Sequence, residues 1–240
     1  MQFYFIRHAQ SANNLLWDTT GTDRGRSDDP PITDLGVQQA ERLAAFLQRQ
    51  SPELRSGWRD PANEAGFGIT HLYCSPMVRA FETARITAER LDLPLTIWKD
   101  WHEGGGLYLK DEDTEETYGT PGKPRGFFQE RYAKVILTDD IKDDGWWNRP
   151  MEQSEERNER AKRVIRDLLE RHGGTQDVVA LVSHGGFYNY FLWALFGLER
   201  QKNIWFLMNN TGITRIDFGE EWIDLVYQNR MDHLLNGFVS

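Results

Sequence analysis

The fold is decided by the stretch Asp177-Val178-Val179-Ala180-Leu181-Val182-Ser183-His184-Gly185-Gly186. Its five central apolar residues do not alternate with polar ones, which is typical of a parallel strand buried on both faces. Two glycines and a second apolar stretch follow, and they predict a helix over residues 186–196. The segment therefore predicts a strand, a tight connection and a helix, with His184 at the end of the strand.

Further strand and helix patterns lie before and after this segment in the chain. We expect a helix after the N-cap residue Thr33, and another that begins at Ser75-Pro76 with Ser75 as its cap. Gly173-Gly174 ends a third. Together these patterns predict an α/β fold, a three-layer sandwich with a mostly parallel central sheet and helices on both faces. The strands are expected at 2–6, 69–74, 95–98, 177–183, 213–218 and 222–227, and the helices at 33–48, 75–91, 155–172 and 186–196.

Residues 104–149 interrupt this alternation with a long polar segment that contains glycines and prolines. Connections of this length are usually lids, binding loops or disordered segments. Two interpretations of its many aromatic side chains stay open, a lid over a substrate and a small satellite core on the sheet edge. We expect one domain over residues 1–240, with 104–149 as an insertion or lid within it. The aromatic residues are Tyr108, Tyr118, Phe127, Phe128, Tyr132, Trp146 and Trp147.

Reactive side chains follow three of the predicted strands directly. Arg7 and His8 come after the first strand, Ser75 and Arg79 after the second, and His184 after the fourth in chain order. The carboxyl ends of parallel strands meet at one edge of an open sheet, and ligands bind in the crevice beyond that edge. The sequence therefore predicts that two arginines and two histidines meet there.

This set of side chains suits the chemistry of phosphoryl groups. Arginine binds anionic oxygens bidentately and keeps its charge, and free N–H groups at helix starts add to the attraction. A neutral imidazole such as His8 can attack phosphorus and form a phosphohistidine. The leaving oxygen then needs a proton, and Glu103, just past the strand at 95–98, can supply it.

Other charged residues have simpler interpretations. His71, His102, His172 and His233 are expected to be structural, because a lone histidine is more often structural than catalytic. No group of residues has the spacing of metal ligands, so we expect no metal and no cofactor. Arg24, Arg26 and the segment 123–125 are expected to be solvated charges.

The net charge, the apolar stretches and the cysteine count limit the partners and the cellular location that we expect. A net charge of -9 argues against a nucleic-acid partner. The apolar stretch 187–198 is too short to span a membrane, and no signal peptide is expected at the start of the chain. The single cysteine, Cys74, excludes an internal disulfide and favours a cytoplasmic location. The expected partner is a small phosphorylated substrate, and a homodimer is left open.

Several motifs in order resemble those of the histidine phosphatase superfamily, the phosphoglycerate mutase-like proteins. One such motif is weak, but six in order are specific. The resemblance covers nearly the whole chain outside 104–149. It is carried by Arg7-His8-Ala9-Gln10-Ser11 with Asn14, Pro31-Ile32-Thr33-Asp34-Leu35-Gly36, Ser75 to Ala84, Trp101-His102-Glu103, Val182 to Gly186 and Asn210-Thr211-Gly212-Ile213-Thr214.

The resemblance implies roles for these residues. His8 would be phosphorylated, Glu103 would donate the proton, and the pocket for the phosphate would be formed by Arg7, Arg79 and His184. Substrate would also contact Asn14 at the rim of the pocket, together with Gln10, Ser11 and Gly185.

Two departures from the family pattern bear on the reaction. Ala9 replaces the usual glycine, and its methyl group is small enough to keep function. Asn13 stands where mutases usually have tryptophan, and Gly104-Gly105-Gly106 replaces a mutase-like stretch. The differences at 13 and 104–106 favour a phosphomonoester phosphatase over the first alternative, a phosphoglycerate mutase-type phosphotransferase. The second alternative, a non-catalytic phosphate-binding protein, is disfavoured because the full set of expected site residues is present. The substrate itself is expected to be selected by 104–149.

Overall fold

A computed structural model describes residues 1–51, 60–111, 113–199, 203–234 and 237–240. Within these residues seven strands form one sheet in the order β6-β3-β2-β7-β1-β8-β9. The first five in this order run parallel, whereas β8 and β9 are antiparallel to their neighbours. The strands are β1 (Gln2–Arg7), β2 (His71–Cys74), β3 (Leu95–Ile97), β6 (Val135–Leu137), β7 (Val178–Ser183), β8 (Ile213–Phe218) and β9 (Ile223–Arg230). The predicted α/β fold with a mostly parallel sheet is confirmed.

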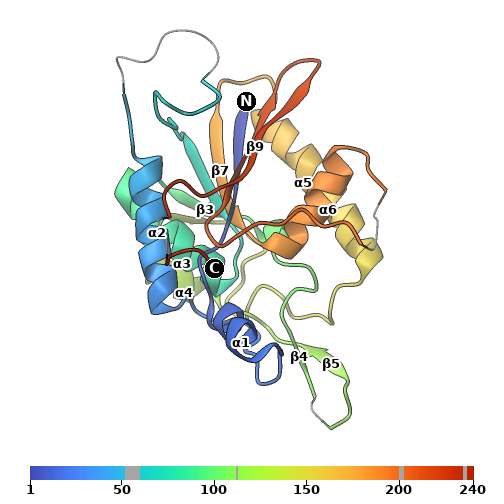
Figure 1. Cartoon of the computed structure of the whole chain (residues 1–240). Coiled ribbons are helices and arrows are strands. Elements are labelled where there is room, and N and C mark those ends of the chain that lie inside the picture. Colours follow the sequence, from blue (N-terminus) through green and yellow to red (C-terminus); the bar gives the residue numbers. More distant parts are fainter. Residues whose placement is uncertain (52–59, 112, 200–202, 235–236) are drawn as a thin grey trace.

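Helices cover both faces of this sheet (Figure 1). α2 (Asp34–Leu47) and α3 (Val78–Leu91) lie on one face, and α5 (Ser154–His172) and α6 (Gly185–Leu195) lie on the other. Successive side chains of a strand point to opposite faces, so β1 supplies both cores. Tyr4 and Ile6 are buried on the α2 and α3 side, and Phe3 and Phe5 on the α5 and α6 side. This two-sided burial explains why the central strands show no alternation.

The start of α3 differs from the prediction. The helix begins at Val78, and Ser75 is not its N-cap. The Ser75 hydroxyl instead accepts a hydrogen bond from the Met77 N–H at 3.2 Å and faces His184. The Val78 N–H at the start of the helix donates to the Asp29 carboxylate at 2.8 Å. A carboxylate from a distant loop therefore caps α3, and no local pattern could have predicted this.

A helix that was not predicted, α1 (Ala12–Thr20), follows the first strand. None of its residues is buried, so it lacks the apolar stripe by which periodicity identifies a helix. Its start is fixed by a capping box, in which the Ser11 hydroxyl accepts from the Asn14 N–H and the Asn14 side chain accepts from the Ser11 N–H.

The insertion 104–149, outside residue 112, has two halves that pack differently, and its role as a lid stays a prediction. Its second half contains α4 (Arg125–Gln129) and then β6, which extends the central sheet beside β3. Phe128, Tyr132, Ile141, Trp146 and Trp147 are buried in the core on the α2 and α3 side. Its first half forms a hairpin, β4 (Tyr108–Lys110) and β5 (Thr117–Gly119), that pairs with itself in the described residues. The hairpin projects near α1, at the carboxyl end of the parallel strands (Figure 1).

The apolar helix α6 packs inside the protein. Residues 187–193 of this helix are all buried against the sheet. The helix has 11 residues, whereas about 20 are needed to cross a bilayer. Among the residues that the structure describes, no helix is both long and apolar enough to span a membrane.

Candidate active site

His8 lies directly after β1, at the carboxyl edge of the sheet. Its backbone N–H donates to the Ser183 carbonyl of the neighbouring strand at 2.9 Å, so the sheet holds it in place. Its Nδ1 lies 2.7 Å from the Ala9 carbonyl oxygen, which can only accept, so Nδ1 carries the proton. The other ring nitrogen, Nε2, accepts a hydrogen bond from Arg79 Nε at 3.2 Å. The Nε2 lone pair therefore faces the arginine.

The surroundings of His8 keep the ring neutral. Burial lowers the pKa of His8 well below its usual value, and the charges of Arg79 and Arg7 lower it further. Burial disfavours the charged imidazolium, and nearby cations repel it. At neutral pH the imidazole is thus unprotonated at Nε2, as a nucleophile must be.

His184, at the end of β7, lies beside His8 with the ring centroids 5.1 Å apart. Its Nε2 is 2.8 Å from the Ser75 hydroxyl. The same hydroxyl accepts from the Met77 N–H and can donate its own proton to His184 Nε2. His184 Nδ1 then carries a hydrogen, and it is buried with no hydrogen-bond partner in the described part of the chain. Burial, followed by Arg79, lowers the pKa of His184 well below its usual value, so this donor is neutral.

Two partly buried arginines, Arg7 and Arg79, supply the positive charge of the site. Arg7 donates from Nη1 to the Met208 carbonyl at 2.6 Å, whereas its buried Nε has no partner among the described residues. Burial lowers the pKa of Arg7 and of Arg79, yet a guanidinium keeps its charge at any physiological pH. Glu103 attracts both cations. The arrangement can bind a dianionic group beside His8.

Glu103 is fixed by the backbone at the start of α6. Its carboxylate accepts hydrogen bonds from the N–H groups of Gly104 at 2.7 Å, Phe187 at 2.7 Å and Gly186 at 3.1 Å. A Cβ on Gly186 would lie 2.6 Å from Glu103 Oε1, so only glycine lets the carboxylate approach this closely. The structure thus brings the expected acid close enough to Arg7 and Arg79 to act on both charges, and holds it at the start of the helix that follows His184.

The glycines after Glu103 are explained by packing. Gly105 and Gly106 have positive φ angles of 97° and 74°. A Cβ on Gly106 would lie 2.0 Å from the Trp147 ring, and one on Gly105 would lie 2.8 Å from Tyr108. Side chains would be strained at both positions, so the run connects Glu103 to the insertion through a closely packed turn.

The four residues expected to contact substrate have varied surroundings. Ser11 is occupied with capping α1, and the Gln10 side chain accepts a hydrogen bond from the Thr33 hydroxyl at 2.8 Å. Gly185 is the first residue of α6 and packs against the Arg7 side chain. Asn14 has a link to the site, because Asn210 donates both to its Oδ1 at 3.4 Å and to the carbonyl oxygen of His8 at 2.8 Å. Their contacts with substrate stay predictions.

Sequence reasoning missed Asp29, the carboxylate that caps α3. Its Oδ2 is buried and has no hydrogen-bond partner among the described residues. Burial raises the pKa of Asp29 to about 6, against the opposing effect of the Arg79 guanidinium. The residue sits in a turn segment, Asp28-Asp29-Pro30-Pro31, whose sequence says nothing about α3. Thr83 lies within the motif from Ser75 to Ala84, which gives it no separate role. Its hydroxyl accepts a hydrogen bond from the Ala9 N–H at 3.0 Å and so fixes the backbone beside His8.

Arg26, expected to be solvated, is half-buried and stacks on the hairpin. Its guanidinium carbon lies 4.6 Å from the centre of the Tyr108 ring in β4. Its charge also acts on Arg79. The loop after α1 and the β4–β5 hairpin therefore meet near Arg79.

Two of the histidines expected to be structural are buried and hydrogen-bonded. His102 stacks against Trp146 and Trp147, and its Nδ1 bonds to the carbonyl oxygen of Glu103. His233 bonds to the hydroxyl of Thr211 at 2.9 Å.

The sequence profile of the histidine phosphatase superfamily (branch 1) matches residues 3–55 and 62–230. The chain belongs to this superfamily. The histidine phosphatase is 24% identical over 227 residues to the "Probable phosphoglycerate mutase GpmB" of Yersinia pestis (strain Pestoides F), which covers 93% of this chain and 88% of that protein. It is thus an enzyme of the histidine phosphatase and phosphoglycerate mutase-like type.

Solved structures share the fold of this histidine phosphatase. A phosphoserine phosphatase from Entamoeba histolytica, in complex with 3-phosphoglyceric acid, aligns with a TM-score of 0.57 and 21% identity over 98% of this chain and 99% of that one. The alpha-ribazole phosphatase from Shigella flexneri aligns with a TM-score of 0.59 and 19% identity over 96% of each chain. At these identities the likeness concerns the fold.

Proposed function

We propose that this histidine phosphatase hydrolyses phosphomonoesters of small metabolites through a phosphohistidine at His8. One observation carries the proposal. The Ala9 carbonyl holds the proton of His8 on Nδ1, so Nε2 presents its lone pair beside Arg79. A purely structural role would not require a neutral ring nitrogen that faces the Arg79 guanidinium.

In the first step the phosphoryl oxygens bind between Arg7, Arg79 and the Nδ1–H of His184. His8 Nε2 attacks phosphorus, the N–P bond forms, and the bond from phosphorus to the leaving oxygen breaks. Glu103, in its protonated form, transfers its proton to that oxygen, and the alcohol departs. The charge of the transferring group stays between the two arginines throughout.

In the second step water attacks the phosphohistidine. Glu103, now ionised, accepts a proton from the water, and the N–P bond breaks to release inorganic phosphate. His8 returns to its neutral form with the proton still on Nδ1. Glu103 thus acts first as acid and then as base, and no group outside the protein is consumed except water.

The residue Asn13 supports hydrolysis over phosphoryl return to substrate. Its side chain exchanges two hydrogen bonds with the backbone of Ser27, at 2.7 and 3.0 Å, in an exposed part of the loop after α1. A mutase must shield the phosphohistidine from water, and a polar amide in place of an apolar ring does not help to exclude it. Mutase action is the second candidate, and the relative named as a phosphoglycerate mutase favours it.

The proposal is tested by trapping the intermediate. Brief incubation with a ³²P-labelled phosphomonoester, followed by denaturation, should leave an acid-labile, base-stable label that mass spectrometry places on His8. The His8→Ala variant should carry no label and lose turnover. Undiminished turnover in that variant would refute the proposal. Stimulation by a bisphosphate, with the label passed to a second substrate, would identify the mutase instead.

A further inference from the structure

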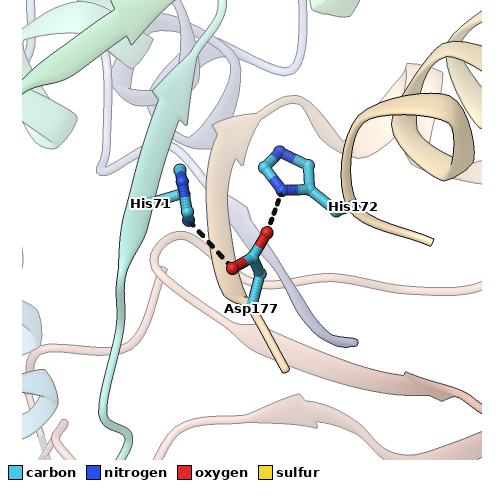
Figure 2. Close-up of side chains that lie close together, drawn as sticks. All are labelled: His71, His172 and Asp177. Atoms are coloured by element: carbon cyan, nitrogen blue, oxygen red, sulfur yellow. Dashed lines mark hydrogen bonds and ion pairs between the residues drawn. The ribbon is translucent and has the colours of Figure 1, made fainter. Parts of the chain in front are cut away.

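A second cluster of polar side chains lies at the opposite edge of the sheet from His8. His71 is the first residue of β2, Asp177 directly precedes β7, and His172 is the last residue of α5. Figure 2 shows the Asp177 carboxylate between the two imidazole rings, with one oxygen toward each ring. The proposed catalytic reaction uses none of these residues, so the cluster needs its own explanation.

The fold brings His71 together with His172 and Asp177, which come much later in the chain. β2 and β7 pair in parallel with His71 beside Val179, which puts the starts of both strands at the same edge. α5 ends at that edge, and a short turn joins His172 to Asp177. Because each position comes from a different element, the spacing along the chain contains no metal-ligand motif.

The distances within the cluster are those of groups that converge on one point. His172 Nδ1 lies 2.8 Å from Asp177 Oδ2, and His71 Nδ1 lies 4.0 Å from Asp177 Oδ1. One nitrogen of each histidine and one carboxylate oxygen all lie within 4.8 Å of one another. The two rings are 4.8 Å apart, centroid to centroid.

We propose that His71, His172 and Asp177 bind a divalent transition-metal ion of the zinc type, with solvent at the remaining coordination position. Two imidazole nitrogens and one carboxylate oxygen form a donor set that Zn²⁺ accepts. The ionised aspartate balances part of the charge of the cation.

The geometry requires only small side-chain movements. Tetrahedral zinc with bonds of about 2.0–2.1 Å separates neighbouring ligand atoms by about 3.4 Å. His172 and Asp177 lie closer than this, and His71 lies farther away. The His71 side chain is 42% exposed and Asp177 is 30% exposed, so both can rotate about their side-chain bonds. The same exposure leaves the ion open to solvent on one side.

Tyr73 provides outer support for the buried ligand. The His172 side chain is 5% exposed, and its Nε2 lies 2.9 Å from the Tyr73 hydroxyl. Without an ion, the tyrosine donates to Nε2 while Nδ1–H donates to Asp177. With the ion on Nδ1, the ring proton resides on Nε2 and the tyrosine accepts it, because a phenol can act in either role. Metal-bound histidines usually have such a second partner on the other nitrogen.

The location indicates a stabilising ion. His71 and Ser75 lie at opposite ends of β2, and Asp177 and His184 lie at opposite ends of β7, so the ion would be remote from the proposed phosphate pocket. It would join the end of α5 to the starts of β2 and β7. An ion that binds only the folded protein raises its stability by mass action.

The experiment uses the full chain, stripped of metal with a chelator and titrated with Zn²⁺ and, separately, with Co²⁺. Calorimetry should show one site, and Co²⁺ should develop visible absorption bands of an N/O-ligated ion. The affinity should fall about tenfold or more in His71→Ala and in Asp177→Asn. The matched control is Asp139→Asn, at an exposed carboxylate outside the cluster, and it should bind as the wild type does. Saturating sulfate, an oxyanion expected to occupy the proposed catalytic pocket without precipitating these ions, should also leave binding unchanged.

Thermal unfolding gives a second readout. Zn²⁺ should raise the melting temperature of the wild type and of Asp139→Asn, and should leave that of His71→Ala unmoved. His71 is half-exposed, so its removal does not threaten folding, which circular dichroism would verify. Equal affinity for Zn²⁺ in the wild type and His71→Ala, or loss of all binding in the presence of sulfate, would overturn the proposal. Loss of the phosphohistidine in His8→Ala has no bearing on it, so the two proposals fail separately.

Discussion

Arg79 Nε lies 3.2 Å from His8 Nε2, within hydrogen-bond distance of the atom that is proposed to attack phosphorus. The same cation is thus proposed to bind the phosphoryl group and also lowers the pKa of the nucleophile. A positive charge in this position favours the neutral imidazole, since it repels the imidazolium form. Substrate affinity and the protonation state of His8 are therefore coupled through one side chain.

Replacement of Arg79 by Gln should raise the pKa of His8. In the wild type the ring stays neutral as the pH falls through 6.5, because its pKa lies well below that value. Burial still opposes the imidazolium in Arg79→Gln, but one repulsive charge is gone, so His8 should gain its proton at a higher pH. Imidazole NMR titration measures this directly. His102 serves as an internal control, because burial and Arg160 lower its pKa. An unmoved His8 titration would contradict the coupling.

Glu103→Gln should reduce the rate most for substrates with poor leaving groups. General acid assistance is typically worth about a hundred- to ten-thousand-fold. An alkyl phosphate needs a proton on its departing oxygen, whereas p-nitrophenolate leaves without one. The ratio of kcat on the two substrates should therefore fall by about a hundredfold in the variant. An equal loss on both substrates would assign Glu103 a structural role.

Gly186→Ala should displace the Glu103 carboxylate without removing it. The added Cβ would lie 2.6 Å from Oε1 and 3.0 Å from the carboxyl carbon, so the side chain must shift. We expect the same preference for good leaving groups as in Glu103→Gln, at smaller magnitude. The matched control is Gly126→Ala in α4, where the new Cβ meets no atom closer than 4.0 Å and kinetics should not change. Wild-type kinetics in Gly186→Ala would contradict the importance of this close approach.

Asp29→Asn should stabilise the protein at alkaline pH. Burial raises the pKa of Asp29 to about 6 from an ordinary 3.8, so its favourable contribution is full below 3.8 and is lost as the pH rises through 6. The difference between these pKa values corresponds to roughly 3 kcal/mol well above pH 6. The asparagine oxygen can still accept from the Val78 N–H. Denaturant unfolding should show equal stabilities at pH 3.5 and a more stable variant at pH 8; a less stable variant at pH 8 would contradict the sign.

A shortened β4–β5 hairpin should change selectivity among natural substrates while p-nitrophenyl phosphate hydrolysis is retained. The hairpin pairs with itself in the described residues, and Tyr108 meets Arg26 beside the site. Replacement of residues 109–118 by a short glycine-serine turn keeps Tyr108 and the core, and activity against a panel of phosphorylated metabolites is the measurement. The control is Phe128→Ala in the same insertion, which should lower stability by about 3–5 kcal/mol and leave selectivity unchanged. Identical substrate profiles in wild type and shortened hairpin would argue against a lid.

The parts of the fold that sequence predicts well are those with strong local patterns. β7 was predictable from its uninterrupted apolar run, and α2 from its Thr33 cap and apolar face. Strands β4, β5 and β6 were not predicted, because each has three residues and all lie within the polar insertion 104–149, where no period appears. α1 lacks a buried face altogether.

The residues of the candidate site also differ in how well the sequence predicts them. His8, Arg79 and His184 were predictable because strand ends converge at one edge of the sheet. Asp29 was not, because its partner Val78 belongs to an element far along the chain. The role of Ser75 was also misassigned, since a serine before a helix has the pattern of a cap whether or not it bonds elsewhere.

The placement of β1 has a consequence for synthesis of the chain on the ribosome. Among the strands of the sheet β1 comes first in the chain, yet its neighbours are β7 and β8, which begin at Val178 and Ile213. The apolar residues 3–6 therefore stay unpaired until most of the chain has been synthesised and β7 and β8 are available. Transiently exposed apolar strands are prone to aggregate. His8 follows β1 directly, so a nascent chain truncated before β7 holds neither a complete core nor a complete pocket. Premature termination should yield insoluble, inactive fragments.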